Sequence, residues 1–262
     1  MDDVSLAADL VREAGLLASR MLAEGLDTKY KTSISDVVSA ADHAAEELVV
    51  ARLAESRPDD GLVGEEGARR SGAGRTWYVD PVDGTYNFLS RLPYWCSAIG
   101  LADAEGPLVG AVYAPALDEL WLGGRDMPTT LNGAAAPELS ARPLAELSVA
   151  THFHPRNMRD QSRLASWHAA TGASAAVRVL GSASVDLAGV ASGRLGIFLQ
   201  ANLQPWDWVP GAALVIGAGG VAEQVTVDGT RWHIAGNLQA VKDTQAALVN
   251  APVATKPVTN DS

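Results

Sequence analysis

The sequence predicts a mixed α+β and α/β protein whose elements fall into three successive regions. Two amphipathic helices come first, a run of short apolar strands follows, and strands then alternate with helices. The strand run is typical of a largely antiparallel sheet, and the alternation favours an α/β second lobe. With 262 residues the chain can bury a sizeable core, in one large domain or two modest lobes.

The elements are expected in this order. A helix over residues 5–24 has apolar residues at helical spacing and ends at Gly25, and a second helix over about 42–55 ends before the turn sequence of 58–61. Strands are then expected at 76–80, 95–102, 108–114 and 119–122, followed by a loop-rich stretch at 125–138. The alternating region has strands expected at 148–153, 175–180, 194–200 and 221–227, and helices near 158–170, 185–191 and 208–218. The tail after Asn250 is expected to be frayed.

Composition excludes several classes of protein. The 47% hydrophobic content argues against general disorder, and a net charge of −11 argues against nucleic acid as the main partner. The single cysteine, Cys96, excludes an intramolecular disulfide, and its place in a β-rich run favours a core position over a nucleophile. The acidic N-terminus lacks the features of a secretory signal, and no apolar stretch approaches the length of a membrane span. We therefore expect a cytoplasmic protein with no membrane partner.

Residues 80–88 (DPVDGTYNF) form the most informative segment. Asp80 and Asp83 stand three residues apart directly after an apolar strand, and the turn between them could aim both carboxylates and the Val82 carbonyl at one point. Such oxygen ligands suit Mg²⁺, and free amides at Gly84 and Thr85 could bind a phosphate. An ordinary Asp-Gly turn between two strands is the alternative interpretation.

Three further acidic positions are weak signals when taken singly. Glu65, followed by Glu66, fits a solvated loop, Asp42 fits a helix N-cap, and Asp207 fits a first-turn carboxylate favoured by the helix dipole. Their joint appearance with Asp80 and Asp83, in this order, is a stronger signal.

This ordered set resembles the inositol monophosphatase family, within the Li⁺-sensitive, Mg²⁺-dependent phosphatase superfamily that also holds fructose-1,6-bisphosphatase. The resemblance extends from Lys31 to about Gly220. It is carried by two signature-like segments and three shorter ones, WYVDPVDGTYNF (77–88), PWDWVPGAALVIGAGG (205–220), GSASVDLAGVASGRLGIF (181–198), VATHFHP (149–155) and TLNG (130–133).

The resemblance implies a layered αβαβα sandwich and a homodimer. It implies an N-terminal metal-binding lobe over 1–140, an α/β lobe over 141–250, a flexible tail at 251–262, and a metal site between the lobes. Two or three Mg²⁺ ions are implied. Their ligands would be Glu65, Asp80 and the Val82 carbonyl for the first ion, Asp80, Asp83 and Asp207 for the second, and Glu65 for a third, mostly hydrated one.

The resemblance also implies how the remaining residues act. Asp42 would accept a hydrogen bond from the Thr85 hydroxyl, which orients and deprotonates the attacking water, and Glu65 would take part through the third ion. Phosphate oxygens would rest on the Gly84 and Thr85 amides. Ala183, beside Ser182, would line the substrate pocket, and Asp207 would also contact the substrate. The transfer would be in line, with no phospho-enzyme.

The implied function is hydrolysis of a small polyol or sugar phosphate, with inositol 1-monophosphate as the first expectation. Alternatives within the same chemistry are fructose 1,6-bisphosphate, histidinol phosphate and a 3′-phosphonucleotide. A family relative that binds metal without catalysis would be expected to lack a ligand, and none is missing here. A Ca²⁺-binding structural module would explain neither Glu65 nor Asp207.

Substrate choice is where the sequence departs from the family. Gln200 stands seven residues before Asp207, at the substrate-binding position where the inositol phosphatases have glutamate, and Asn202 stands where glycine is common. His152 replaces a usual glycine, and a zinc pair with His154, a substrate contact or plain packing are its alternative roles. Three polar positions flank the expected site, namely Lys31, Asp36 and His43. Glycines 217, 219 and 220 mark the end of a helix.

Overall fold

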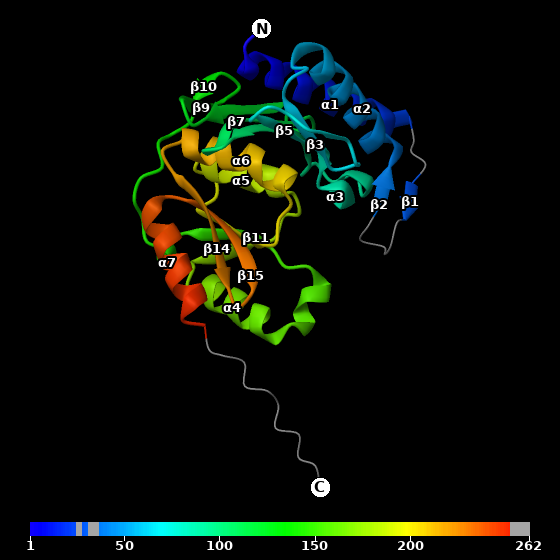
Figure 1. The fold of residues 1–262 in the computed structure, drawn as a ribbon. Coiled ribbons are helices and arrows are strands. Elements are labelled where there is room, and N and C mark those ends of the chain that lie inside the picture. The colour runs from blue at the N-terminus through cyan, green and yellow to red at the C-terminus, as the bar shows by residue number, and fades with distance from the viewer. Residues whose placement is uncertain (25–27, 31–36, 252–262) are drawn as a thin grey trace.

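The chain folds into five alternating layers of helix and sheet. The computed structural model describes residues 1–24, 28–30 and 37–251. An outer helical layer covers an eight-stranded sheet, a central helical pair separates that sheet from a five-stranded one, and further helices cover the far face (Figure 1). The helices are α1 (Asp3–Glu24), α2 (Ala40–Ser56), α3 (Thr85–Leu89), α4 (Gln161–Gly172), α5 (Ala183–Ala191), α6 (Pro205–Gly217) and α7 (Leu238–Val249). The expected αβαβα sandwich is confirmed.

The eight-stranded sheet carries the N-terminal part of the site. Its strand order is β10-β9-β8-β7-β6-β5-β3-β4, and all pairs are antiparallel except β3 with β5. Its strands are β3 (Gly61–Gly64), β4 (Arg69–Arg70), β5 (Thr76–Asp83), β6 (Cys96–Asp103), β7 (Gly106–Ala114), β8 (Glu119–Gly124), β9 (Met127–Leu131) and β10 (Ala134–Ala135). The expectation of a loop-rich stretch at 125–138 was wrong, because β9 and β10 extend the sheet there through turns whose polar residues mask the strand pattern.

The five-stranded sheet has the order β12-β11-β13-β15-β14. β11 runs parallel to both of its neighbours, and β15 is antiparallel to β13 and β14. Its strands are β11 (Ser148–His152), β12 (Ala176–Arg178), β13 (Ile197–Ala201), β14 (Val221–Val227) and β15 (Thr230–Gly236). Outside both sheets lie a two-stranded ribbon and two short 3₁₀ turns, β1 (Thr28–Tyr30), β2 (Val37–Ser39), η1 (Leu144–Glu146) and η2 (Pro155–Arg159).

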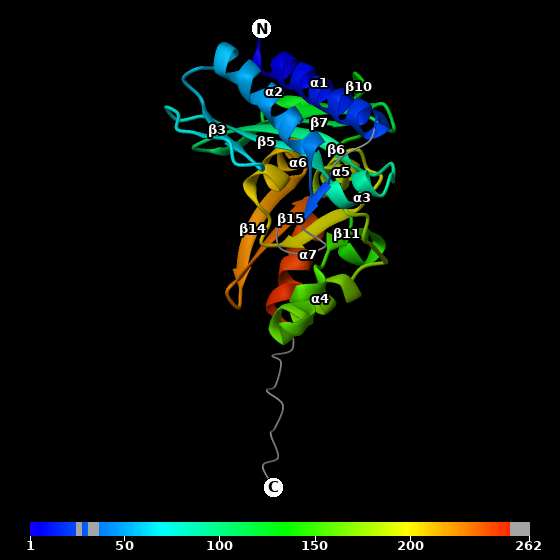
Figure 2. The ribbon, with the colours of Figure 1, turned by 90° about the vertical axis from the view of Figure 1, so that its right-hand side faces the viewer.

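The outer helices α1 and α2 lie side by side on the eight-stranded sheet (Figure 2). α1 buries Leu6, Leu10 and Ala14 at helical spacing, and these pack with Trp77 and Ile99 of the sheet in one cluster. The amphipathic pattern of residues 5–24 therefore identified a helix with one buried face.

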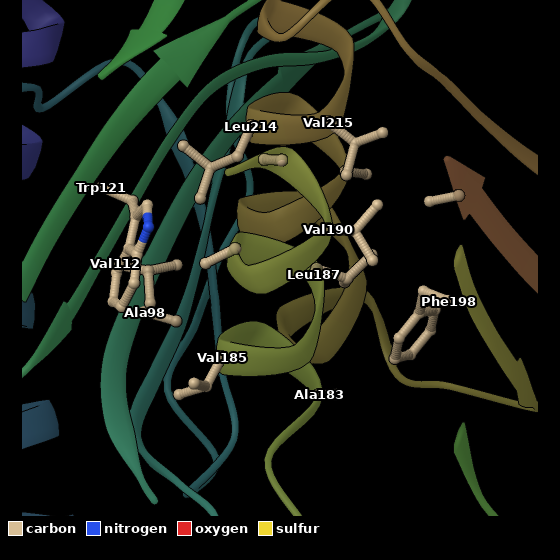
Figure 3. Close-up of a cluster of buried hydrophobic side chains, with 14 of the residues drawn as sticks. Ala98, Val112, Trp121, Ala183, Val185, Leu187, Val190, Phe198, Leu214 and Val215 are labelled. Carbon is tan, nitrogen blue, oxygen red and sulfur yellow. The ribbon is translucent and has the colours of Figure 1, made fainter. Parts of the chain in front are cut away.

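The central helices α5 and α6 lie between the two sheets and are largely apolar, and the polar residues Ser184 and Asp186 of α5 are buried with the rest. In Figure 3, Leu187 and Val190 of α5 and Leu214 and Val215 of α6 stand between Trp121 on one side and Phe198 on the other. All nine residues of α5 are buried. α5 and α6 follow residue 140 in the chain, yet they pack on the sheet formed before it, so the proposed lobe boundary at 140–141 stays a prediction.

α6 begins at Pro205, three residues before the expected start, and this places Asp207 inside its first turn. β15 and α7 were not expected from the sequence. The helix signal at α7 was present, since Asn237 caps it by accepting from the Ala240 amide at 3.0 Å, and buried Ala240, Val241, Thr244 and Leu248 recur at helical spacing.

Candidate active site

Three aspartates from two distant segments meet at the first turn of α6. Asp80 and Asp83 lie at the end of β5, Asp207 lies in α6, and one carboxylate oxygen from each is within 4.8 Å of the other two. Asp80 is only 1% exposed and Asp83 only 7%. Among the described residues this is the group whose side chains could hold a metal ion.

Local backbone irregularity at the end of β5 produces this arrangement. The register of β5 with β6 shifts between Asp80 and Asp83, so the regular alternation of side chains is broken. Pro81 cannot donate to the ladder, and its carbonyl accepts from the Ser97 hydroxyl at 2.5 Å. Gly84 then turns with a φ of 93°, a value that favours glycine, and α3 starts at the next residue. The DPVDG sequence is therefore a bulged strand end and not a simple hairpin turn.

Asp83 is held by the N-terminus of α5. Its carboxylate accepts from the Ser182 hydroxyl at 3.0 Å, from the Ala183 amide at 3.3 Å and from the Ser184 amide at 2.5 Å. Amides at a helix N-terminus favour a negative charge, so these bonds fix the carboxylate and tie α5 to β5. Ser182 and Ala183 lie against the acidic group, and the substrate contact expected of Ala183 stays a prediction.

Glu65 lies in the turn after β3, and this turn is anchored on two sides. The Glu65 amide donates to the Val79 carbonyl at 3.1 Å. Glu46 of α2, only 5% exposed, accepts from the Glu66 amide at 2.8 Å and from the Ala68 amide at 3.0 Å. A side chain at Gly64 would collide with the Glu46 carboxylate, which explains the glycine. Glu46 was not among the residues expected from the sequence, although it stands four residues after Asp42 and so shares its helix face.

The electrostatics of the three aspartates and of Glu65 favour a bound cation. Burial, and then the charge of Asp207, raises the pKa of Glu65 to about 8. Burial, and then the charge of Asp83, raises the pKa of Asp207 to about 7, and burial likewise raises the pKa of Asp80 and Asp83. Asp80 Oδ1 is buried and has no hydrogen-bond partner among the described residues. Acids this crowded ionise together only when positive charge is shared among them, so the residues fit a divalent metal ion.

Asp42 and Thr85 stand at the edge of this group. Asp42 is 2% exposed in the first turn of α2, and its charge adds to the repulsion that raises the pKa of Glu65 after burial and Asp207. The Thr85 hydroxyl donates to the Val82 carbonyl at 3.1 Å. The expected Thr85–Asp42 hydrogen bond would need this hydroxyl to turn, so it stays a prediction. The Val82 carbonyl keeps a second lone pair for a metal.

Gln200 and His152 occupy neighbouring positions in the five-stranded sheet. They are paired in the parallel register of β11 and β13, so the two departures from the family pattern stand next to each other. Asn202 has a different explanation. Its φ is 54°, its amide donates to the Arg231 carbonyl at 2.7 Å, and its side-chain oxygen accepts from the Arg231 amide at 3.2 Å. Asparagine therefore meets the same left-handed requirement as glycine.

The other sequence-derived candidates are placed as follows. Cys96 is fully buried, which confirms a core position, and burial raises the pKa of its thiol. His154 Nδ1 accepts from both the amide and the Nε of Arg156, and the zinc pair with His152 stays a prediction. His43 is largely exposed, 3.4 Å from Glu66. Lys31 and Asp36 lie outside the described residues.

Comparison with known proteins gives one consistent result. The model of the inositol monophosphatase family matches residues 2–255. A fructose-1,6-bisphosphatase/inositol-1-monophosphatase of Aquifex aeolicus is 31% identical over 228 residues, which cover 84% of this chain and 86% of that protein. An inositol-1-monophosphatase of Rhizobium meliloti is 36% identical over 190 residues, 71% of each chain, and the Nus factor SuhB of Escherichia coli K12 is 31% identical over 245 residues, 90% of each.

The fold comparison agrees with the sequence comparison. The structure of an inositol monophosphatase from Anabaena superposes with a TM-score of 0.80 at 27% identity, over 95% of this chain and 96% of that one. Among the described residues, no helix combines the length and apolarity needed to cross a bilayer. The chain belongs to the inositol monophosphatase family and is a phosphoric monoester hydrolase.

Proposed function

We propose that the protein is a Mg²⁺-dependent phosphomonoesterase for small polyol or sugar phosphates, with inositol 1-monophosphate as the first substrate to test. The observation that carries the proposal is the convergence of Asp80, Asp83 and Asp207 on one point. The substrate class is supported by relatives named inositol-1-monophosphatase. The name of the Aquifex relative makes fructose 1,6-bisphosphate the main alternative, ahead of histidinol phosphate and a 3′-phosphonucleotide.

Mg²⁺ is the proposed metal because the donors are carboxylate and carbonyl oxygens, which hard cations prefer. The proposed ligands are Glu65, Asp80, the Val82 carbonyl, Asp83 and Asp207, for two or three ions. When bound, Mg²⁺ would polarise the phosphoryl group and lower the pKa of water. The raised pKa values and the unpaired Asp80 oxygen support this assignment.

The proposed roles of the other residues are those that the family resemblance implies. Thr85 and Asp42 would orient the attacking water and take its proton, and the Gly84 and Thr85 amides at the start of α3 would hold phosphate oxygens. Gln200 and Ala183 would contact the leaving group together with Asp207. A non-catalytic metal-binding role is less well supported, since every acidic position of the family pattern is filled. A homodimer, and the lack of a nucleic-acid partner, stay predictions.

Phosphate release from inositol 1-monophosphate with and without Mg²⁺ tests the proposal. Asp80→Asn removes a charged ligand oxygen and should reduce the rate by at least about 100-fold, on the scale of other single losses at catalytic sites. Asp59→Asn, at an exposed position, is the matched control and should keep the wild-type rate. Full activity in Asp80→Asn would overturn the metal assignment. Faster hydrolysis of fructose 1,6-bisphosphate would move the substrate assignment to the alternative.

A further inference from the structure

Arg69 contacts both segments that present the distant acids Glu65 and Asp207. Its Nη1 donates to the Gly64 carbonyl at 2.8 Å, and Gly64 directly precedes Glu65. Its guanidinium carbon lies 5.4 Å from the ring centroid of Trp206, and Trp206 directly precedes Asp207. A weaker bond from the same Nη1 reaches the Ala68 carbonyl at 3.3 Å.

We propose that Arg69 is a positioning residue that holds the Glu65 turn and the start of α6 at the separation needed for metal binding. The inference rests on the proposed metal-dependent function and adds to it a residue that the family pattern did not supply. Glu46 ties the Glu65 turn to α2, and the α5 N-terminus ties Asp83 in place. Arg69 supplies the corresponding link between the Glu65 turn and Asp207.

Such a link matters because Glu65 and Asp207 lie on separate elements, the turn after β3 and the first turn of α6. A metal site built from both acids needs the two segments at one fixed separation. If the segments were free to move apart, metal binding would have to bring them together at a cost in free energy. A contact that keeps the segments in place reduces that cost and so tightens metal binding.

Arginine is suited to this position by its shape. The planar guanidinium can donate in its plane to a carbonyl while its face lies over an aromatic ring. Lysine offers a single ammonium group and satisfies one of the two contacts well. β4 fixes the starting point of the side chain, since Arg69 pairs with Val63 in the register of β3 and β4.

A positioning role and a simple charge effect predict changes of opposite sign. Arg69 adds positive charge near an acidic metal site, so removal of the charge alone should tighten Mg²⁺ binding. Loss of the link should weaken it. Arg69→Met keeps most of the aliphatic stem but removes the charge, the hydrogen bond and the cation–π contact, so the direction of the change separates the two explanations.

The test is calorimetric titration of the whole protein with Mg²⁺ in the absence of substrate. We expect Arg69→Met and Trp206→Leu each to weaken Mg²⁺ binding by roughly three- to tenfold, with Arg69→Lys in between, on the scale of one exposed cation–π contact and one hydrogen bond. The double variant should bind Mg²⁺ no more weakly than the single variant with the lower Mg²⁺ affinity, because both substitutions break the same link between Arg69 and Trp206. The melting temperature of the metal-free protein should change little.

Arg70→Met is the matched control. Arg70 donates to the Asp60 and Arg57 carbonyls, away from the metal site, so its loss should leave the Mg²⁺ dissociation constant unchanged even where stability falls. Equal or tighter Mg²⁺ binding by Arg69→Met, or additive losses in the double variant, would overturn the positioning role alone. A wild-type protein that binds no Mg²⁺ would overturn the proposed function as well.

Discussion

Replacement of the buried Glu46 by glutamine should destabilise the protein through the Glu65 turn. The Glu46 carboxylate accepts from two backbone amides, those of Glu66 and Ala68, one on each oxygen. Glutamine offers one acceptor oxygen, and its NH₂ group would face the other amide. Hydrogen bonds to a charged acceptor contribute roughly 1.5–3 kcal/mol each and a neutral one roughly 1, so the net loss should be about 2–5 kcal/mol.

Urea unfolding followed by tryptophan fluorescence, in EDTA at pH 7, measures this loss directly. Glu47→Gln is the matched control, because Glu47 is the exposed neighbour on the same helix, and its free energy of unfolding should stay within about 0.5 kcal/mol of wild type. The Mg²⁺ dissociation constant of Glu46→Gln should also rise, since the turn that presents Glu65 is no longer held. A free energy of unfolding equal to that of the control would refute the anchoring role of Glu46.

Further predictions concern the pH dependence of stability, the steric fit of the Glu65 turn, substrate specificity and inhibition by Li⁺. The acids of the site have pKa values that are higher in the folded than in the unfolded protein. Their contribution to the stability of the metal-free protein should therefore be fully present below about pH 4 and be lost as the pH rises towards about 8, the pKa of Glu65. Mg²⁺ should reverse the loss at pH 8, and urea unfolding curves that show no difference between pH 5 and pH 8 would contradict this prediction. Gly64→Ala should weaken Mg²⁺ binding several-fold in calorimetric titration, because its methyl group collides with the Glu46 carboxylate; wild-type affinity would show that the turn adapts. Gln200→Glu should raise turnover of inositol 1-monophosphate in a phosphate-release assay, and an unchanged rate would remove Gln200 from substrate selection. Millimolar Li⁺ should inhibit the same assay, and insensitivity would separate this protein from the inositol-type branch.

The sequence predicted the parts of the site that lie within contiguous motifs. The bulged segment from Asp80 to Gly84 and the first turn with Asp207 are each encoded by neighbouring residues, and their resemblance to family signatures linked them across the chain. The α5 and α6 segments were expected as helices, and their largely apolar composition is explained by their position between two sheets.

The parts that the sequence did not reveal depend on tertiary contacts. Glu46 and Arg69 are polar residues in ordinary surroundings along the chain, and they become important through backbone groups and a ring that other elements bring to them. Asn202 was noted as a departure that could affect specificity, and its left-handed backbone gives a conformational explanation. A single sequence carries no signal for such contacts beyond the spacing of Glu46 from Asp42.

The most direct test of the metal site is an anomalous diffraction measurement on crystals soaked in Mn²⁺, which takes the same oxygen ligands as Mg²⁺. We expect a strong anomalous peak within coordinating distance of the Asp80, Asp83 and Asp207 carboxylates. A map with no peak there, or with Mn²⁺ bound only elsewhere, would contradict the assignment of these acids to a catalytic metal.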